Sequence, residues 1–277
     1  MKIDVHVHTN ASDGKYPVEE IIKMAYDNGV RVLAITDHDT VAAIPRAVEC
    51  AKNYPDLTLI PGIEMSSTYP GCEVHILGYF VDWKDPHFLE QLQGMRESRV
   101  NRAGAMVEKC RELGMDITMD RVREIAGDAN IGRPHIAHAI LEKGYAATWD
   151  EVFDKYLGHG GLAYVERVKI SPYEAVCLLH DAKGIVSFAH PFLTSDYKAI
   201  LPQLLEAKIE GIETYYKTFN DEQRKELKKC CQENNLIPTG GTDFHGIEDD
   251  EVFIGESGIP NETVLALLDV AHKRGRI

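Results

Sequence analysis

The sequence has few cysteines and no cysteine pattern. Six cysteines occur in 277 residues, and only Cys230 and Cys231 are neighbours. Disulfide scaffolds and zinc fingers repeat cysteines at short intervals, so this spacing disfavours both classes. The sequence also lacks an N-terminal leader with a basic segment followed by an apolar one. We therefore expect a protein of the reducing cytoplasm.

Long apolar runs and an excess of positive charge are missing as well. No stretch is apolar for long enough to span a membrane. Lysine and arginine number 30 against 44 aspartates and glutamates, which gives a net charge of -14. Long nucleic acids and anionic membranes usually bind basic surfaces, so we expect neither as a partner. No feature of the sequence indicates a protein partner.

The sequence does contain short apolar segments that alternate with helical patterns towards both of its ends. The candidate strands are "KIDVHVH", "RVLAIT", "LTLIPG", "EVHILGYF", "GIVSFAH", "GIETYY" and "LIPTGG". Helix signals lie between them: Pro17 starts a run that stops at Gly29, and Ser171 and Glu174 form a capping-box pattern. This alternation is typical of α/β proteins and predicts a closed barrel.

The middle of the chain differs, because residues 86–161 contain amphipathic helical patterns and few candidate strands. We predict helices over 86–114, 118–126 and 134–144, and a fourth that Thr148 and Glu151 cap. No Gly/Ser linker, low-complexity tract or solenoid repeat is present. The predicted organisation is a barrel domain, 1–85 and 162–277, with an inserted helical subdomain, 86–161, that packs on it.

The first candidate strand carries an unusual set of polar side chains. Alternate residues of a strand face opposite ways, so Asp4, His6 and His8 share one face and the apolar residues between them share the other. Asp13 follows shortly after. A single histidine beside a strand is more often structural, but imidazoles and carboxylates together suit divalent cations. The segment therefore indicates one face that packs and one that binds metal.

Further histidines and carboxylates fall on or just after other candidate strands. In barrels of parallel strands, the loops that follow the strands converge on one active site. The candidate ligands are His6, His8, Asp13, His38, Glu64, His75, His190, Asp243 and His245. This nitrogen and oxygen set suits Mn, Zn or Fe, and its size is too large for one ion and reasonable for two or three. The pattern disfavours the alternative, which is nine unrelated polar residues.

Six segments that carry these residues resemble the successive motifs of the PHP (polymerase and histidinol phosphatase) family. They are "DVHVHTNASDG", "ITDHDT", "PGIEMS", "HILGYF", "AHP" and "GTDFHG". The resemblance implies an α/β fold, a distorted (β/α)7 barrel related to the amidohydrolases, with three divalent ions, Mn²⁺ first and Zn²⁺ or Fe²⁺ as alternatives. The implied ligands are His6, His8, Glu64 and Asp243 for one ion, Glu64, His75 and His190 for a second, and Asp13, His38 and His245 for a third.

Three segments in the middle of the chain resemble the insertion of the stand-alone PHP phosphoesterases: "ESRVNRA", "IGRPHIAHAILEKGY" and "FDKYLGHGGLAYVERVKIS". That branch includes phosphatases that remove the 3′-phosphate of 3′,5′-bisphosphonucleosides and 5′-to-3′ exoribonucleases of short RNA. We therefore expect hydrolysis of a bisphosphonucleoside such as pAp to AMP and phosphate. Short 5′-phosphorylated RNA is the alternative substrate, and histidinol phosphate ranks lower.

The sequence departs from the family after "GIETYY". Lys217, Thr218 and Phe219 stand where the family has a proline and often a histidine. This difference predicts a pocket wall that selects a somewhat different substrate.

Catalytic proton transfer needs groups beside the expected metal centre. Asp243 is expected to take up the proton of the nucleophile, and His190 or His245 to protonate the leaving oxygen.

A second substrate phosphate needs cations outside the metal centre. Arg133 and His135 lie at the start of a predicted helix, where the helix dipole and bidentate hydrogen bonds favour phosphate. The alternative for Arg133 is a structural tie between the subdomain and the barrel. Arg167 and Lys169 are further candidates, with a solvated charged face as the alternative.

Two rival functions belong to other classes. Amide hydrolysis occurs in the related amidohydrolases, but those barrels typically use a carboxylated lysine between the metals and fewer carboxylates. Some polymerase-linked PHP domains are structural and have lost metal ligands. Here no ligand position is missing, which favours an active enzyme.

Overall fold

The chain forms two compact units. The computed structural model describes residues 2–127, 131–166, 170–246 and 253–276. The first unit comprises Met1–Leu89 and Ile170–Ile277, and the second is Glu90–Lys169. The second unit begins and ends slightly later than the subdomain proposed from the sequence, 86–161.

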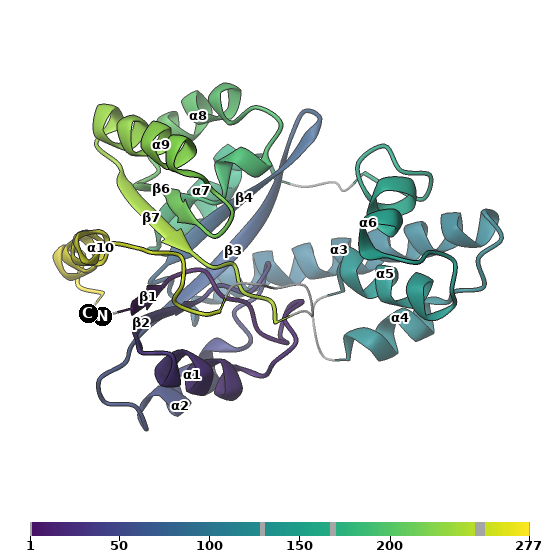
Figure 1. The fold of residues 1–277 in the computed structure, drawn as a ribbon, viewed down its shortest axis with the longest axis horizontal. Helices are drawn as coiled ribbons and strands as arrows, with labels where there is room; N and C mark the ends of the chain where they lie inside the picture. Colours follow the sequence, from purple (N-terminus) through teal and green to yellow (C-terminus); the bar gives the residue numbers. More distant parts are fainter. Residues whose placement is uncertain (1, 128–130, 167–169, 247–252, 277) are drawn as a thin grey trace. The chain divides into compact units, whose positions relative to one another are not determined.

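The first unit is built on a seven-stranded sheet in which each strand pairs with its neighbours in chain order (Figure 1). The strands are β1 (Lys2–Asp4), β2 (Val30–Ile35), β3 (Thr58–Tyr69), β4 (Cys72–Tyr79), β5 (Ile185–Phe188), β6 (Gly211–Tyr216) and β7 (Ile237–Gly241). All neighbouring pairs are parallel except those of β4, which is antiparallel to both β3 and β5. β4 therefore begins at the end of the sheet where the parallel strands finish.

The sheet curls into a nearly closed barrel because its two outer strands meet just beyond their ends. The Asp243 N–H donates to the His6 carbonyl at 2.8 Å, and the His8 N–H donates to the Phe244 carbonyl at 3.0 Å. The same two strands are also joined by a side chain: the buried Asp4 carboxylate accepts hydrogen bonds from the Thr242 N–H at 3.0 Å and from the Thr242 hydroxyl at 2.6 Å. The expected seven-stranded α/β barrel is confirmed.

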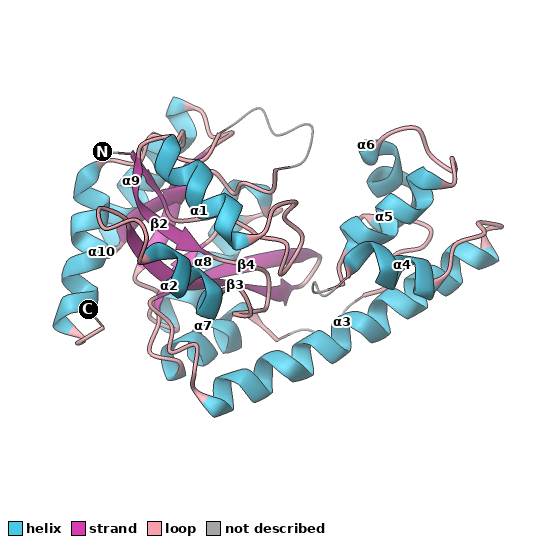
Figure 2. Cartoon of the chain, turned by 90° about the horizontal axis from the view of Figure 1, so that it is seen from below, coloured by secondary structure: helices cyan, strands magenta, loops and turns pink. Residues whose placement is uncertain are grey.

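Helices surround the strands of the first unit (Figure 2). They are α1 (Val18–Asp27), α2 (Ile44–Ala51), α7 (Pro172–Asp181), α8 (Tyr197–Glu206), α9 (Asp221–Asn234), α10 (Asn261–Lys273) and a short 3-10 helix, Pro191–Leu193. The start of α1 after Pro17 and the reciprocal capping box between Ser171 and Glu174 at α7 are as predicted. No helix in the described ranges is long and apolar enough to cross a membrane.

The second unit is helical and has a core of its own. α3 (Pro86–Glu112) begins in the first unit and continues into the second, followed by α4 (Met119–Ala126), α5 (Arg133–Glu142), α6 (Trp149–Val152) and a π-helical turn, Phe153–Leu157. Buried side chains such as Met106, Ile136 and Val152 form one hydrophobic cluster. Thr148 caps α6 by accepting a hydrogen bond from the Glu151 N–H, as predicted, whereas the π turn has no counterpart among the predictions.

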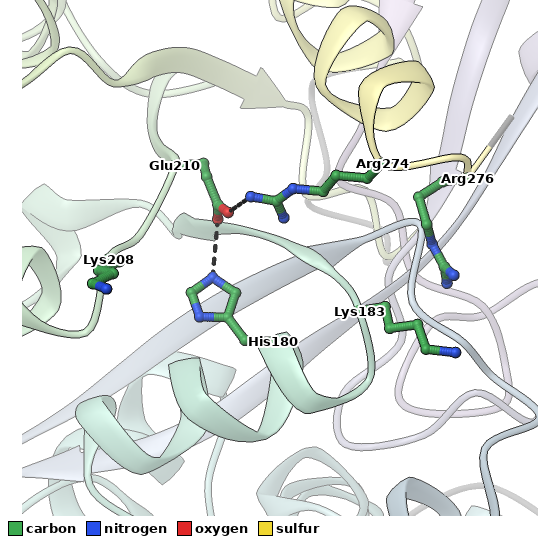
Figure 3. A pocket seen from close by; sticks show the side chains of 6 residues that line it. All are labelled: His180, Lys183, Lys208, Glu210, Arg274 and Arg276. Atoms are coloured by element: carbon green, nitrogen blue, oxygen red, sulfur yellow. Dashed lines mark hydrogen bonds and ion pairs between the residues drawn. The ribbon is translucent and has the colours of Figure 1, made fainter.

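A charged pocket lies where β5 and β6 begin (Figure 3). Glu210, just before β6, accepts hydrogen bonds from the Val186 N–H at 2.8 Å and from His180 Nε2 at 3.2 Å, and it pairs with Arg274. Arg274 is the C-cap of α10 and His180 lies in the last turn of α7. The Arg274 guanidinium at the C-terminus of α10 offsets the negative end of the helix dipole, so a structural role explains its pairing with Glu210.

We predict that Thr242→Val destabilises the protein by about 1–3 kcal/mol, because the buried Asp4 carboxylate loses a hydrogen bond while the shape of the side chain is kept. Chemical unfolding followed by circular dichroism measures the difference. The control is Thr58→Val at an exposed position of β3, where we expect a change within about 0.5 kcal/mol. Equal effects of the two substitutions would contradict a role for Asp4 and Thr242 in closing the barrel.

Candidate metal centre

The structure brings the nine candidate ligands of the sequence together at one end of the barrel. His6 and His8 follow β1, His38 follows β2, His190 follows β5, and the remaining five are Asp13, Glu64, His75, Asp243 and His245. Two of them do not lie at the C-terminal end of a strand as expected. Glu64 is in the middle of β3, and His75 reaches the site because β4 runs antiparallel.

The carboxylate of Glu64 lies at the centre of the cluster. Its Oε1 atom is 2.9 Å from His190 Nε2 and 3.0 Å from His75 Nδ1. Its Oε2 atom is 3.0 Å from His38 Nδ1, 3.2 Å from His8 Nε2 and 3.3 Å from His6 Nε2. One buried side chain therefore contacts five imidazoles that come from four separate parts of the chain.

Three overlapping groups of donor atoms have the spacing of a metal site, with all atoms of a group within 4.8 Å of one another. The groups are His6, His8, Glu64 and Asp243; His38, Glu64 and His75; and His8, Asp13, His38 and His245. They overlap more than the resemblance implied, since His8 and His38 each belong to two groups. His190 is in none of the three, but it contacts Glu64.

Besides their spacing, the lack of hydrogen bonds at several donor atoms indicates that they bind divalent cations. His6 Nε2, His8 Nε2, Asp13 Oδ1 and Glu64 Oε2 are buried and make no hydrogen bond within the described part of the chain. Burying a polar atom without a partner costs free energy, so such atoms are rare unless an ion or water satisfies them. Nitrogen and carboxylate oxygen donors without cysteine suit Mn, Zn or Fe.

Burial and the charges of neighbouring side chains shift the pKa values of the histidines in the cluster. Burial opposes the charged form of His8, but the carboxylates of Asp243 and Glu64 outweigh it and raise the pKa of His8 to about 10. Burial is likewise outweighed at His75, mainly by Glu64, and its pKa rises to about 9. At His38 burial prevails, with the positive charges of His8 and His75 adding to it, and the pKa falls to about 3.

Several residues that hold the ligands in place were not predicted as functional. Asp37 accepts hydrogen bonds from the Thr9 N–H at 2.7 Å and the Ser12 hydroxyl at 2.7 Å, which fixes the loop that carries Asp13. Glu213 in β6 contacts His6 at 2.9 Å. A carboxylate inside the apolar segment "GIETYY" is the one sequence signal that could have pointed to it.

The residues predicted to bind a second phosphate lie in the other unit. Arg133 is the first residue of α5, and its guanidinium carbon is 5.8 Å from the ring centroid of Phe153. His135 is buried, and its Nδ1 atom accepts a hydrogen bond from the Gly132 N–H at 2.9 Å, so the ring caps its own helix. Arg167 and Lys169 lie outside the described residues.

The PHP domain model matches residues 4–235, and the chain therefore belongs to the PHP family. The chain is 31% identical over 247 residues to the 5′-3′ exoribonuclease Rnm of Escherichia coli, covering 87% of this chain and 84% of that protein. It is 27% identical over 248 residues to a 3′,5′-nucleoside bisphosphate phosphatase of Chromobacterium violaceum, covering 88% and 87% of the two chains.

Solved structures agree with this membership. A protein described as a metal-dependent phosphoesterase from Bifidobacterium adolescentis has a TM-score of 0.86 at 27% identity, with 96% of this chain and 95% of that chain covered. A protein described as an amidohydrolase from Chromobacterium violaceum, with bound sulfate, has a TM-score of 0.87 at 26% identity over 98% and 96% of the chains. The protein is a metal-dependent phosphoester hydrolase, as the motifs predicted.

We predict that metal binding releases protons near neutral pH. His8 and His75 have pKa values of about 10 and about 9, so both are protonated in the metal-free protein at neutral pH, and each must lose a proton from the nitrogen that binds a cation. The observed enthalpy of Mn²⁺ binding should therefore differ between HEPES and Tris at about pH 7.5, and affinity should fall as the pH is lowered. Equal enthalpies in the two buffers would contradict these protonation states.

Proposed function

We propose that the protein hydrolyses the 3′-phosphate of 3′,5′-bisphosphonucleosides, converting pAp to AMP and phosphate with three divalent ions. Mn²⁺ is the ion we place first, with Zn²⁺ and Fe²⁺ as alternatives. The observation that carries this proposal is the set of three overlapping donor groups, two of which share Glu64 while the third shares His8 and His38 with them. A centre of several cations suits a reaction in which negative charge develops on the phosphoryl and leaving oxygens.

The proposed ligand sets are those that the family resemblance implies, and they differ from the donor groups in two places: His190 stands in place of His38 beside Glu64 and His75, and His8 is left out of the third set. His6, His8, Glu64 and Asp243 would hold one ion, Glu64 with His75 and His190 a second, and Asp13, His38 and His245 a third. His8 and His38 lie close enough to serve neighbouring positions as well. When bound, the ions would lower the pKa of water and neutralise charge on the phosphate.

The chain's own groups supply proton transfer in this proposal. The Asp243 carboxylate, with Oδ1 3.0 Å from His8 Nε2, would take up the proton of the attacking water. His190 or His245 would protonate the 3′-oxygen as it leaves. His245 Nδ1 donates to the Asp243 carbonyl at 3.0 Å, so Nε2, 3.4 Å from Asp13 Oδ1, is the nitrogen that would either ligate the third ion or carry the proton, and His245 can act as the acid only where Nε2 does not bind metal.

The 5′-phosphate of the substrate is assigned to the helix N-terminus at Arg133. Main-chain N–H groups and a guanidinium suit a phosphate dianion. His135 would shape this site through its bond to Gly132, and Arg167 and Lys169 would add positive charge.

A second candidate function is 5′-to-3′ cleavage of short 5′-phosphorylated RNA. It is favoured by the exoribonuclease relatives, which are 31% and 32% identical to this chain in Escherichia coli and Haemophilus influenzae. Both candidate reactions break the bond between phosphorus and the 3′-oxygen of a nucleotide that carries a 5′-phosphate. They differ only in whether a further nucleotide is attached to the phosphorus.

The test measures phosphate and mononucleotide release with Mn²⁺ from pAp, from AMP and from a short 5′-phosphorylated oligoribonucleotide. We expect rapid conversion of pAp to AMP, little hydrolysis of AMP, and no activity in a His75→Ala control. Release of mononucleotides from RNA while pAp stays intact would replace the phosphatase by the exoribonuclease. If none of the three substrates gives a product, both candidate functions are wrong. Sugar phosphates and histidinol phosphate are then the substrates to test.

We predict that Arg133→Ala lowers kcat/KM for pAp by about 10- to 100-fold, the loss expected for a charge-assisted hydrogen bond to phosphate. Hydrolysis of 3′-AMP, which lacks the 5′-phosphate, should change little. The matched control is Arg123→Ala, which removes an exposed arginine that pairs with Asp120 on α4. A similar loss on both substrates would contradict a role for Arg133 in binding the 5′-phosphate.

A further inference from the structure

Strand β6 contributes none of the nine candidate ligands, yet all six of its residues are buried and two of them contact ligands. Glu213 has no solvent exposure. One of its carboxylate oxygens is 2.9 Å from His6 Nδ1, and the other accepts the His190 N–H at 2.7 Å. Both oxygens of a buried carboxylate are thus engaged by residues of the metal centre.

The contact with Glu213 fixes which nitrogen of His6 can bind a metal. An ionised carboxylate only accepts hydrogen bonds, so Nδ1 of His6 must carry the hydrogen. Nε2 then presents its lone pair to the centre, where it lies 3.3 Å from Glu64 Oε2 and 3.3 Å from Asp243 Oδ1. A carboxylate behind a histidine also makes the imidazole a stronger ligand.

Tyr216, three residues further along β6, plays the equivalent part for Asp243. Its hydroxyl donates to Asp243 Oδ2 at 2.8 Å, while Oδ1 faces His8 Nε2 at 3.0 Å. Because the phenol holds Oδ2, Oδ1 is the oxygen of Asp243 that faces the other candidate ligands of its group.

Two of the three ligands that Glu213 and Tyr216 contact, His190 and Asp243, have strained backbones. His190 has a φ of +26° and Asp243 a φ of +49°, a region that side chains other than glycine adopt at a cost. Glu213 holds the His190 N–H, and Tyr216 holds the Asp243 side chain. Strain of this kind persists where the surroundings enforce it, so β6 supports both residues in their positions.

We propose that Glu213 and Tyr216 are positioning residues that set the metal affinity of the centre: Glu213 selects the Nε2-ligating tautomer of His6 and fixes His190, and Tyr216 directs Oδ1 of Asp243 to the metal. This inference rests on the metal centre of the proposed function. Neither residue is required to touch substrate.

The experiment titrates Mn²⁺ into metal-free protein by calorimetry and records the melting temperature of the same samples. In Glu213→Gln the side chain keeps its size but has one acceptor oxygen, so either His6 or the His190 N–H loses its partner. We expect the Mn²⁺ affinity to fall about 10- to 100-fold, with a smaller fall in Tyr216→Phe and with activity recovering at high Mn²⁺.

The matched control is Glu210→Gln, which removes a carboxylate at the other end of β6 (Figure 3). It should lower the melting temperature and leave Mn²⁺ affinity unchanged. Unchanged affinity in Glu213→Gln would overturn the proposal, because the contacts would then be merely structural. If Glu213→Gln does not fold, Tyr216→Phe decides in the same way.

Binding is measured without substrate, which separates this inference from the proposed function. Wild-type protein that binds Mn²⁺ but cleaves no nucleotide would defeat the function and leave the positioning role to be decided by the variants. Wild-type protein that binds no Mn²⁺, Zn²⁺ or Fe²⁺ would overturn the positioning role itself.

Discussion

The burial of one carboxylate among five imidazoles is the constraint on which the site depends. Glu64 is almost completely shielded from water, and its two oxygens lie within 3.3 Å of nitrogens from all five of these histidines. Such a group is costly to bury unless opposite charge compensates it. The barrel therefore has to place residues from separate parts of the sequence around one point. Two irregular features of the fold bring them there.

These two features show how the fold meets the constraint. The antiparallel β4 brings His75 next to Glu64 by a hairpin, without the helical crossover that a parallel strand would need. At the seam between the first and last strands, the backbone of Asp243 bonds directly to His6, so closing the barrel and joining two candidate ligands are the same event. Stability of the scaffold and geometry of the site are thus coupled at this seam.

The sequence predicted much of the fold because its signals are local. Alternation of apolar residues marked the strands, and Pro17, Ser171 with Glu174 and Thr148 marked helix starts that the structure confirms. The candidate ligands were recognisable because histidines and carboxylates are unusual in otherwise apolar strands.

The parts that were missed depend on long-range pairing. Glu213 and His6 are 207 residues apart, and no spacing rule connects them. Asp37 is not among the candidate residues, although its oxygens fix the loop before Asp13, because its partners Thr9 and Ser12 lie more than 20 residues away in the sequence. The direction of β4 and the sharing of His8 between two donor groups follow from how strands pair in space, which composition and periodicity do not encode.

The spread of the ligand residues along the chain has a consequence for how the protein is made. The group of His38, Glu64 and His75 is complete within the first third of the sequence, whereas the other two groups each need Asp243 or His245. A chain emerging from the ribosome in N- to C-terminal order can therefore assemble at most this one group until residue 243 has been made. The other two groups can take up metal only after the segment with Asp243 and His245 has been synthesised and has paired with the first strand.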